Sequence, residues 1–187
     1  MLAVIRSLDV GAVDLFGHSM GGTVGIIAAL KDSQAIGRLI VAEANVEPGG
    51  GGASLAIARQ GREAFLAEGY AKLIDKLDAD ARPDYGPTLR YAAWRDADPA
   101  AFFDSAAGLV DLPQDFFLQY KGLPNPGAFI YGSRTLAAGP TPDTPDPALL
   151  EQAGIRTLTV ADAGHSMMFD NLPGFMHALV AALDIKA

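Results

Sequence analysis

Short apolar runs alternate along the chain with longer segments in which apolar residues recur at helical spacing. The run Val13–Phe16 ends at a glycine, and residues 20–30 continue in Ala, Ile and Gly with a spacing that suits a helix. Residues 38–42, 127–132 and 156–160 repeat the short pattern and are rich in β-branched and aromatic side chains. The pattern predicts four strands with helices between them.

The predicted strands are almost continuously apolar and do not alternate between apolar and polar residues. Such strands are typical of a parallel sheet that is covered by helices on both faces. We therefore expect the α/β class, with a parallel sheet of about four strands. A chain of 187 residues is long enough to bury a sizeable core, and we expect residues 1–187 to form one domain.

One connection is much longer than a parallel sheet requires. Between the second and third predicted strands lie about eighty residues, far more than a crossover helix needs. The connection begins with Glu47, Pro48 and four glycines, and a helical cap inserted at about residues 47–125 explains its length. Four aromatic residues of this segment are expected either to line an apolar acyl pocket or to form the core of the cap: Phe65, Trp94, Phe102 and Phe103.

Composition and charge exclude several classes of partner. The formal net charge is −8 and the Lys and Arg residues are scattered, so no basic surface is expected for nucleic acid. No apolar run reaches the roughly 20 residues that cross a bilayer, and the first residues lack the pattern of a secretory leader, so we expect a cytoplasmic protein with no membrane partner. The absence of cysteine excludes disulfides, thiolate metal sites and a cysteine nucleophile.

The segment Gly17–Gly21, which reads G-H-S-M-G, has the form G-x-S-x-G. In this motif a sharp turn from strand to helix presents the serine hydroxyl, and here the motif follows a predicted strand and opens a predicted helix. Residues 13–22 resemble the α/β-hydrolase superfamily, whose nucleophile elbows often read G-H-S-M-G-G. The resemblance implies a serine hydrolase in which Ser19 is the nucleophile and the backbone N–H of Met20 belongs to the oxyanion hole.

A serine hydroxyl needs a neighbouring base, most often a histidine that a carboxylate orients. The chain has three histidines. His18 lies inside the elbow and His177 within the last predicted helix, and we expect both to be structural. His165 follows the fourth predicted strand and precedes the last helix, where the superfamily places its catalytic histidine. We therefore expect His165 to be the base.

The carboxylate of the triad is less obvious. Relatives commonly place an aspartate after the strand that precedes the histidine, in a G-x-x-D pattern, but residues 132–135 read G-S-R-T. Glu43 is the favoured acid, because it stands at the carboxyl end of the strand next to the nucleophile's strand. Its interval from Ser19 also resembles that of haloalkane dehalogenases, which use a glutamate after this strand. The open alternatives are Asp143, Asp146, Asp162 or no acid at all.

Superfamily members run through four strands before the elbow, whereas only residues 1–12 precede the elbow strand here. The resemblance thus covers nearly the whole chain but only the C-terminal half of the fold. The second oxyanion donor, which relatives take from a loop after an earlier strand, has no counterpart. The elbow strand would also become an open edge, so we expect Val13–Phe16 to pair with the same strand of a second chain, as a homodimer, or to be covered by the cap.

The leading functional expectation is a serine hydrolase that cleaves carboxylic esters, with small or medium, largely apolar acyl groups, through an acyl-enzyme on Ser19. One alternative is a cofactor-free perhydrolase or hydroxynitrile lyase, which uses the same three residue types. Another is a catalytically weak or silent fragment that needs a partner. No cofactor is expected, and no metal, because neither His18 nor His165 has a second ligand at i+4.

Overall fold

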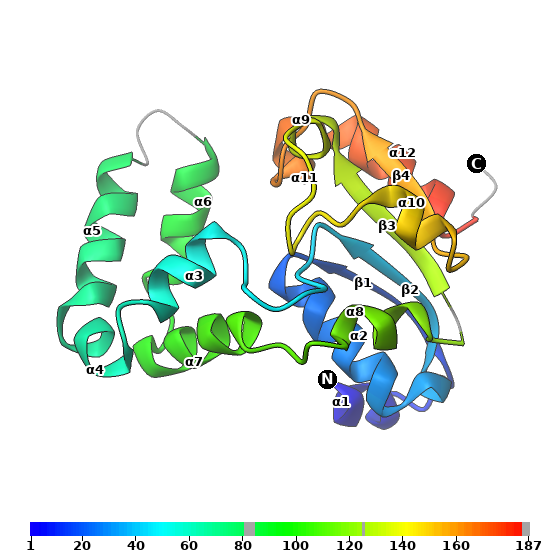
Figure 1. Cartoon of the computed structure of the whole chain (residues 1–187), viewed down its shortest axis with the longest axis horizontal. Coiled ribbons are helices and arrows are strands. Elements are labelled where there is room, and N and C mark those ends of the chain that lie inside the picture. The colour runs from blue at the N-terminus through cyan, green and yellow to red at the C-terminus, as the bar shows by residue number, and fades with distance from the viewer. Residues whose placement is uncertain (81–84, 125, 185–187) are drawn as a thin grey trace. The chain divides into compact units, whose positions relative to one another are not determined.

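The computed structural model of the chain describes residues 1–80, 85–124 and 126–184. The chain divides into two compact units (Figure 1). The first unit comprises Met1–Pro48 and Pro113–Ala187, and the second comprises Gly49–Leu112. In the part of the chain that the structure describes, no helix is long and apolar enough to span a membrane.

The first unit is built on a four-stranded sheet in the order β1-β2-β3-β4. The strands are β1 (Val13–His18), β2 (Ile36–Ala42), β3 (Pro126–Gly132) and β4 (Arg156–Val160). All three neighbouring pairs are parallel, so the carboxyl ends of the four strands lie at one edge of the sheet (Figure 1). The structure confirms the predicted α/β class and the parallel sheet.

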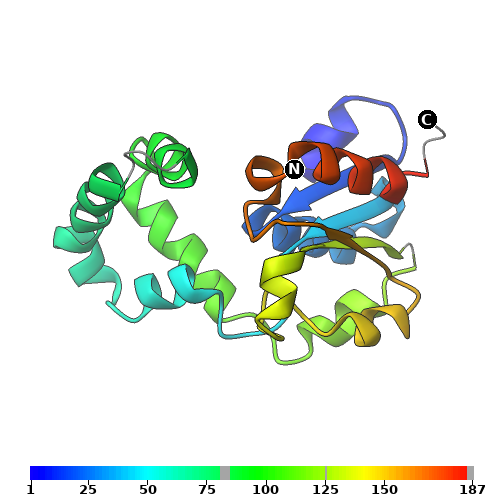
Figure 2. The same cartoon turned by 90° about the horizontal axis from the view of Figure 1, so that it is seen from above.

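Helices of the first unit flank the sheet. Their bounds are α1 (Leu2–Ser7), α2 (Met20–Lys31), the 3₁₀ helix η1 (Ser33–Ala35), α8 (Phe116–Lys121), α9 (Ser133–Ala137), α10 (Pro147–Glu151), α11 (Met167–Asp170) and α12 (Leu172–Ala182). Helix α12 lies on one face of the sheet, and α8 and α10 lie on the other (Figure 2). Helix α2 follows β1 directly, and α11 and α12 follow β4.

Strand β2 shows why the predicted strands are apolar without alternation. Ile40 and Ala42 belong to a buried cluster with β3, β4 and α12. Leu39 and Val41, which point the other way, lie against glycines of α2. Because successive side chains of a strand point to opposite faces, and both faces are covered here, positions 39–42 are all apolar.

The second unit is helical. Its elements are α3 (Gly52–Ala58), α4 (Arg62–Ala64), the π-helix η2 (Phe65–Gly69), α5 (Tyr70–Asp80), α6 (Tyr85–Trp94) and α7 (Pro99–Val110). Phe65 and Phe103 are buried in the core of the unit, and Phe102 and Trp94 are partly buried. The Phe102 ring stacks on Phe65 and meets the edge of Trp94. All four aromatic residues therefore pack within the unit itself. The unit ends at Leu112, so α8, which lies inside the predicted range 47–125, packs with the sheet.

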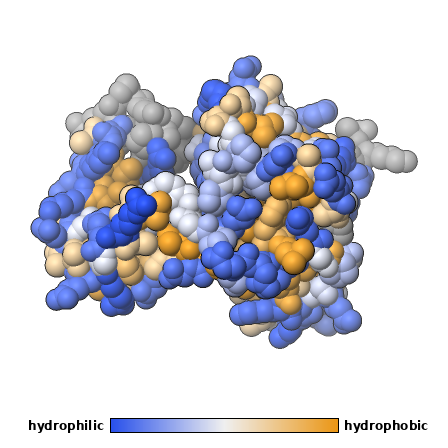
Figure 3. Space-filling view, in the orientation of Figure 1, coloured by the Kyte–Doolittle hydropathy of each residue, from blue (hydrophilic) through white to orange (hydrophobic). Residues whose placement is uncertain are grey.

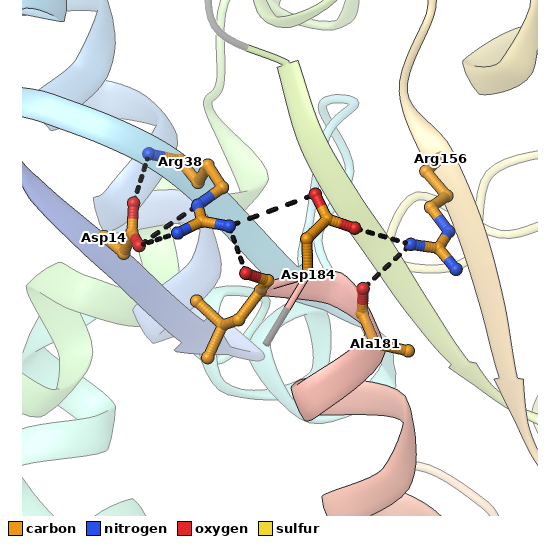
Figure 4. Close-up of polar contacts among 6 residues, drawn as sticks. Asp14, Arg38, Arg156, Ala181 and Asp184 are labelled. Carbon is orange, nitrogen blue, oxygen red and sulfur yellow. Dashed lines mark hydrogen bonds and ion pairs between the residues drawn. The ribbon is translucent and has the colours of Figure 1, made fainter. Parts of the chain in front are cut away.

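Two arginines hold the C-terminus of α12 beside the sheet (Figure 4). Arg38 on β2 donates to the Asp14 carboxylate on β1, at 2.7 and 3.1 Å, and to a carbonyl at the end of α12. Arg156 on β4 donates to the Ala181 carbonyl at 2.8 Å and to Asp184 at 3.3 Å. The last carbonyls of a helix lack partners inside the helix and carry partial negative charge, which these guanidinium groups satisfy.

Some apolar side chains of the first unit remain on its surface. Figure 3 shows apolar surface gathered over the α8 region, where Leu118 is 68% exposed. Others lie on or beside the edge strand β1 and its neighbouring helices α1 and α2, and these are Val4, Leu8, Val10, Phe16, Met20 and Val24. Single exposed apolar residues are ordinary, but several around an edge strand mark a place where another chain segment can bind.

Candidate active site

The turn at Gly17–Gly21, which the sequence predicts to be a nucleophile elbow, joins β1 to α2. Ser19 has a φ of 54° and a ψ of −131°, a conformation that is uncommon for a residue with a side chain. The turn requires glycine at position 17, because a Cβ there would lie 2.5 Å from the carbonyl oxygen of Gly21. The Ser19 N–H donates to the Ala42 carbonyl of β2 at 2.9 Å. Local strain of this kind clusters at functional sites.

The structure brings Ser19, His165 and Glu43 into one hydrogen-bonded chain. The Nε2 atom of His165 is 3.1 Å from Ser19 Oγ, and its Nδ1 atom is 2.9 Å from Glu43 Oε2. An ionised carboxylate only accepts hydrogen bonds, so Nδ1 carries the hydrogen and Nε2 presents its lone pair to the serine hydroxyl. This arrangement suits removal of the Ser19 proton by His165.

Glu43 is fully buried directly after β2. Its second oxygen, Oε1, accepts the N–H of Gly132 at 2.7 Å, so each carboxylate oxygen has a partner. Glu43 also has a positive φ of 38°, and its own N–H donates to the Ile130 carbonyl of β3. A charge that is removed from water needs such partners, and here they leave the other oxygen directed at His165.

His165 lies in the loop between β4 and α11, and two residues hold this loop that the sequence did not single out. Arg134 donates from its backbone to Ala163 and from its side chain to Asp170, each at 2.8 Å. Asp170 in turn accepts the N–H of Gly164 at 2.7 Å. Arg134 stands in the G-S-R-T segment, where the aspartate of relatives is missing. No local pattern in the sequence indicates that it binds the loop of the histidine.

The alternative carboxylates have other partners. Asp143 accepts a hydrogen bond from the Thr141 hydroxyl at 2.6 Å, and Asp146 caps α10 by accepting the Ala148 N–H at 2.9 Å. The side chain of Asp162 is exposed. Of the carboxylates that the sequence left open, Glu43 is the one bonded to His165.

Met20 is the first residue of α2, and the first N–H groups of a helix have no partner within it. The N-terminal end of a helix also favours negative charge nearby. The Met20 N–H therefore stays the predicted donor to an oxyanion formed next to Ser19. A single well-placed donor of this kind contributes on the order of 10² to 10³ in rate.

The two remaining histidines differ in their surroundings. His177 is exposed on α12. His18 ends β1 and lies against His165, with the two ring centroids 4.7 Å apart. Burial, and after it the positive charge that His165 can carry, lower the pKa of His18 below its usual range. Among the described residues, no group of three or more His, Asp or Glu side chains is placed to hold a metal ion.

The sequence profile of the Alpha/beta hydrolase family matches residues 1–181. No curated protein matches the chain. Among solved structures, the chain is similar to a thermophilic esterase from Thermogutta terrifontis, with 19% identity, a TM-score of 0.71, and 98% of this chain and 68% of that chain covered. The enol-lactonase from Burkholderia xenovorans LB400 is 21% identical with a TM-score of 0.72, and 98% of this chain and 70% of that chain are covered. A bromoperoxidase from Bacillus anthracis is 17% identical with a TM-score of 0.70, and 97% of this chain and 70% of that chain are covered. At these identities the likeness shows a shared fold.

Proposed function

The chain belongs to the alpha/beta hydrolase family, and on this premise we propose that it is a serine hydrolase that cleaves carboxylic esters through an acyl-enzyme on Ser19. The observation that carries the proposal is the hydrogen-bonded chain from Ser19 Oγ through His165 to the buried carboxylate of Glu43. Each of the three residues has the chemical type and the partner that its role in this reaction requires.

In the first half of the reaction His165 Nε2 takes the hydroxyl proton while Ser19 Oγ attacks the ester carbonyl carbon. The carbonyl oxygen becomes negative and is stabilised by the Met20 N–H. The C–O bond to the alcohol then breaks, and His165 gives its proton to the departing alkoxide. Glu43 stabilises the imidazolium that exists between these steps.

In the second half a water molecule repeats the attack on the acyl-enzyme. His165 removes a proton from the water, the new tetrahedral centre collapses, and Ser19 recovers its proton as the carboxylic acid leaves. The acyl group is expected to be small or medium in size and largely apolar. A panel of p-nitrophenyl esters of increasing acyl length measures this preference directly.

A cofactor-free perhydrolase is the second candidate function, supported by the likeness to the bromoperoxidase from Bacillus anthracis. It would use the same three side chains but release a peracid, because hydrogen peroxide would replace water in the second half. Peroxide-dependent halogenation by the wild type, lost in Ser19→Ala, would favour this candidate. Ester hydrolysis without such halogenation would favour the esterase.

The test of the proposed function is covalent labelling of the whole chain by a fluorophosphonate probe, together with turnover of a p-nitrophenyl ester. We expect labelling of the wild type and its loss in Ser19→Ala, with turnover lower by on the order of 10⁴-fold or more in Ser19→Ala and His165→Ala. Ser105→Ala is the matched control, because Ser105 is exposed and its hydroxyl donates to the Ala101 carbonyl within α7. A wild type that is neither labelled nor active would favour the silent fragment and contradict the proposal.

A further inference from the structure

His18 touches the proposed base at two points. Its Nε2 atom is 2.7 Å from the carbonyl oxygen of His165, and its ring lies against the His165 ring at an angle of 45°. These residues are far apart in the sequence, yet His18 is the immediate neighbour of Ser19. The end of β1 therefore carries Ser19, the proposed nucleophile, and also contacts the backbone of His165, the proposed base.

The direction of this hydrogen bond follows from its acceptor. A carbonyl oxygen has no hydrogen to donate, so Nε2 of His18 carries the hydrogen and donates it. His18 is partly buried, and its lowered pKa keeps it neutral at neutral pH with this hydrogen in place. A neutral donor fits the site, since a charged His18 would repel the His165 imidazolium that forms during the reaction.

The contact completes the restraint of His165. Glu43 fixes the Nδ1 side of the ring. Arg134 and Asp170 bind the loop at Ala163 and Gly164, just before His165, and neither contacts His165 itself in these bonds. His18 binds the peptide group of His165, and its ring limits rotation of the imidazole on one side. The distance from His165 Nε2 to Ser19 Oγ therefore depends on the pair of adjacent residues 18 and 19.

From these contacts we propose that His18 is a positioning residue, which holds the carbonyl and the ring of His165 so that Nε2 stays within hydrogen-bond reach of Ser19 Oγ. The inference rests on the proposed function, because it assigns a role relative to the base of that reaction. It goes beyond packing: the role requires an N–H donor at this position and not only a ring of suitable size.

The test compares two substitutions that separate the effect of the His18 N–H donor from the effect of the size of its side chain. His18→Phe keeps a flat ring but removes the N–H, and His18→Gln keeps an amide N–H donor. A misplacement of about 1 Å in an active site can lower the rate on the order of 10²-fold, so we expect kcat of His18→Phe to fall by about 10- to 100-fold, with KM within about twofold. We expect His18→Gln to recover most of this loss.

Labelling by the fluorophosphonate probe follows acylation directly and should slow in parallel with kcat in His18→Phe. His177→Gln, at an exposed position on α12, is the matched control and should leave both rates unchanged. Thermal unfolding of each variant identifies any that fail to fold. If His18→Phe does not fold, His18→Leu and His18→Gln are compared in its place.

Two outcomes are distinguishable. A wild type that is not labelled would overturn the proposed function together with this inference. If the wild type is labelled and His18→Phe has the same kcat as the wild type, the positioning role alone is overturned. The same holds if a folded His18→Gln is as slow as His18→Phe.

Discussion

The two oxygens of the Glu43 carboxylate have different partners, and this makes one substitution informative. In Glu43→Gln the amide oxygen can still accept the Gly132 N–H, but the negative charge beside His165 is lost. The imidazolium is then less stable and the tautomer of His165 is no longer fixed, so we expect kcat to fall on the order of 10²- to 10⁴-fold. Ester turnover measures the effect.

Glu47→Gln is the control, because Glu47 is exposed four residues further along the chain. If Glu43→Gln retained full turnover, the assignment of the acid would be wrong. Thermal unfolding of the same two variants separates a loss of activity from a loss of structure.

The two outer glycines of the G-x-S-x-G motif, Gly17 and Gly21, differ in the space around them, although the motif requires glycine at both positions. A Cβ at Gly17 would meet backbone atoms of Gly21 and Gly22 at 2.5–2.7 Å, whereas a Cβ at Gly21 would meet nothing within 4 Å. We expect Gly17→Ala to lower the free energy of unfolding by about 1–3 kcal/mol. Gly21→Ala is expected to be neutral or to raise it by up to about 1 kcal/mol, because Gly21 lies in a helix.

Urea unfolding of the two alanine variants measures this difference. Equal stabilities would show that the backbone at Gly17 can move away from an added methyl group. Because backbone atoms give way much less readily than the end of a flexible side chain, we expect the two variants to separate clearly.

At the scale of elements, β1 is an edge strand, and in the described part of the chain it pairs only with β2. Exposed apolar side chains surround it. Two pairs of charges nearby are formed within the chain, Arg38 with Asp14 and Arg6 with Asp32. A second copy, although it also carries a net charge of −8, would therefore meet no unpaired charge from these four residues. We propose that β1 pairs with β1 of a second copy about a twofold axis.

Light scattering after size-exclusion chromatography tests this pairing. We expect the wild type to have the mass of two 19.5 kDa chains and Phe16→Lys to have the mass of one, because a lysine on the edge opposes strand pairing. Leu118→Lys, on the exposed surface of α8, is the control and should remain a dimer. A monomeric wild type would contradict the proposal.

The strands were predictable from sequence because both faces of the sheet are buried. The predicted runs 38–42, 127–132 and 156–160 lie within or coincide with β2, β3 and β4. The position of α8 was not predictable, because its six residues look alike whether they pack on the sheet or in the inserted helices. The sharp turn at Ser19 was predictable because the G-x-S-x-G motif is local in sequence. The contact of His18 with His165, and the hold of Arg134 on the histidine loop, join distant residues and leave no periodic pattern.

At the scale of the whole molecule, His18 links folding to pH. Its pKa is lower in the folded chain than the usual value of about 6.5 in an unfolded chain. The unfolded state therefore binds more protons as the pH falls below about 6.5, and folding stability is lost as the pH falls through the folded pKa. Above a pH of about 6.5, the stability that depends on neutral His18 is fully present.

We expect the thermal unfolding temperature of the wild type to fall as the solution is acidified through this range. The fall should be smaller in His18→Gln, because glutamine at position 18 does not titrate, while His177→Gln should follow the wild type. The carboxylates and His165 are present in all three proteins, so a difference between the wild type and His18→Gln reports on His18. Equal slopes for wild type and His18→Gln would contradict the prediction.

The second unit joins the first at two points of the chain that lie close together within that unit. The Gly49 N–H donates to the Val110 carbonyl at 2.8 Å, so the two ends of the inserted segment lie side by side. Ser19, Glu43 and His165 all belong to the other unit. The helices between Gly49 and Leu112 can therefore be lengthened, trimmed or exchanged for another module, in nature or by a protein engineer, while the three residues of the proposed triad keep their scaffold.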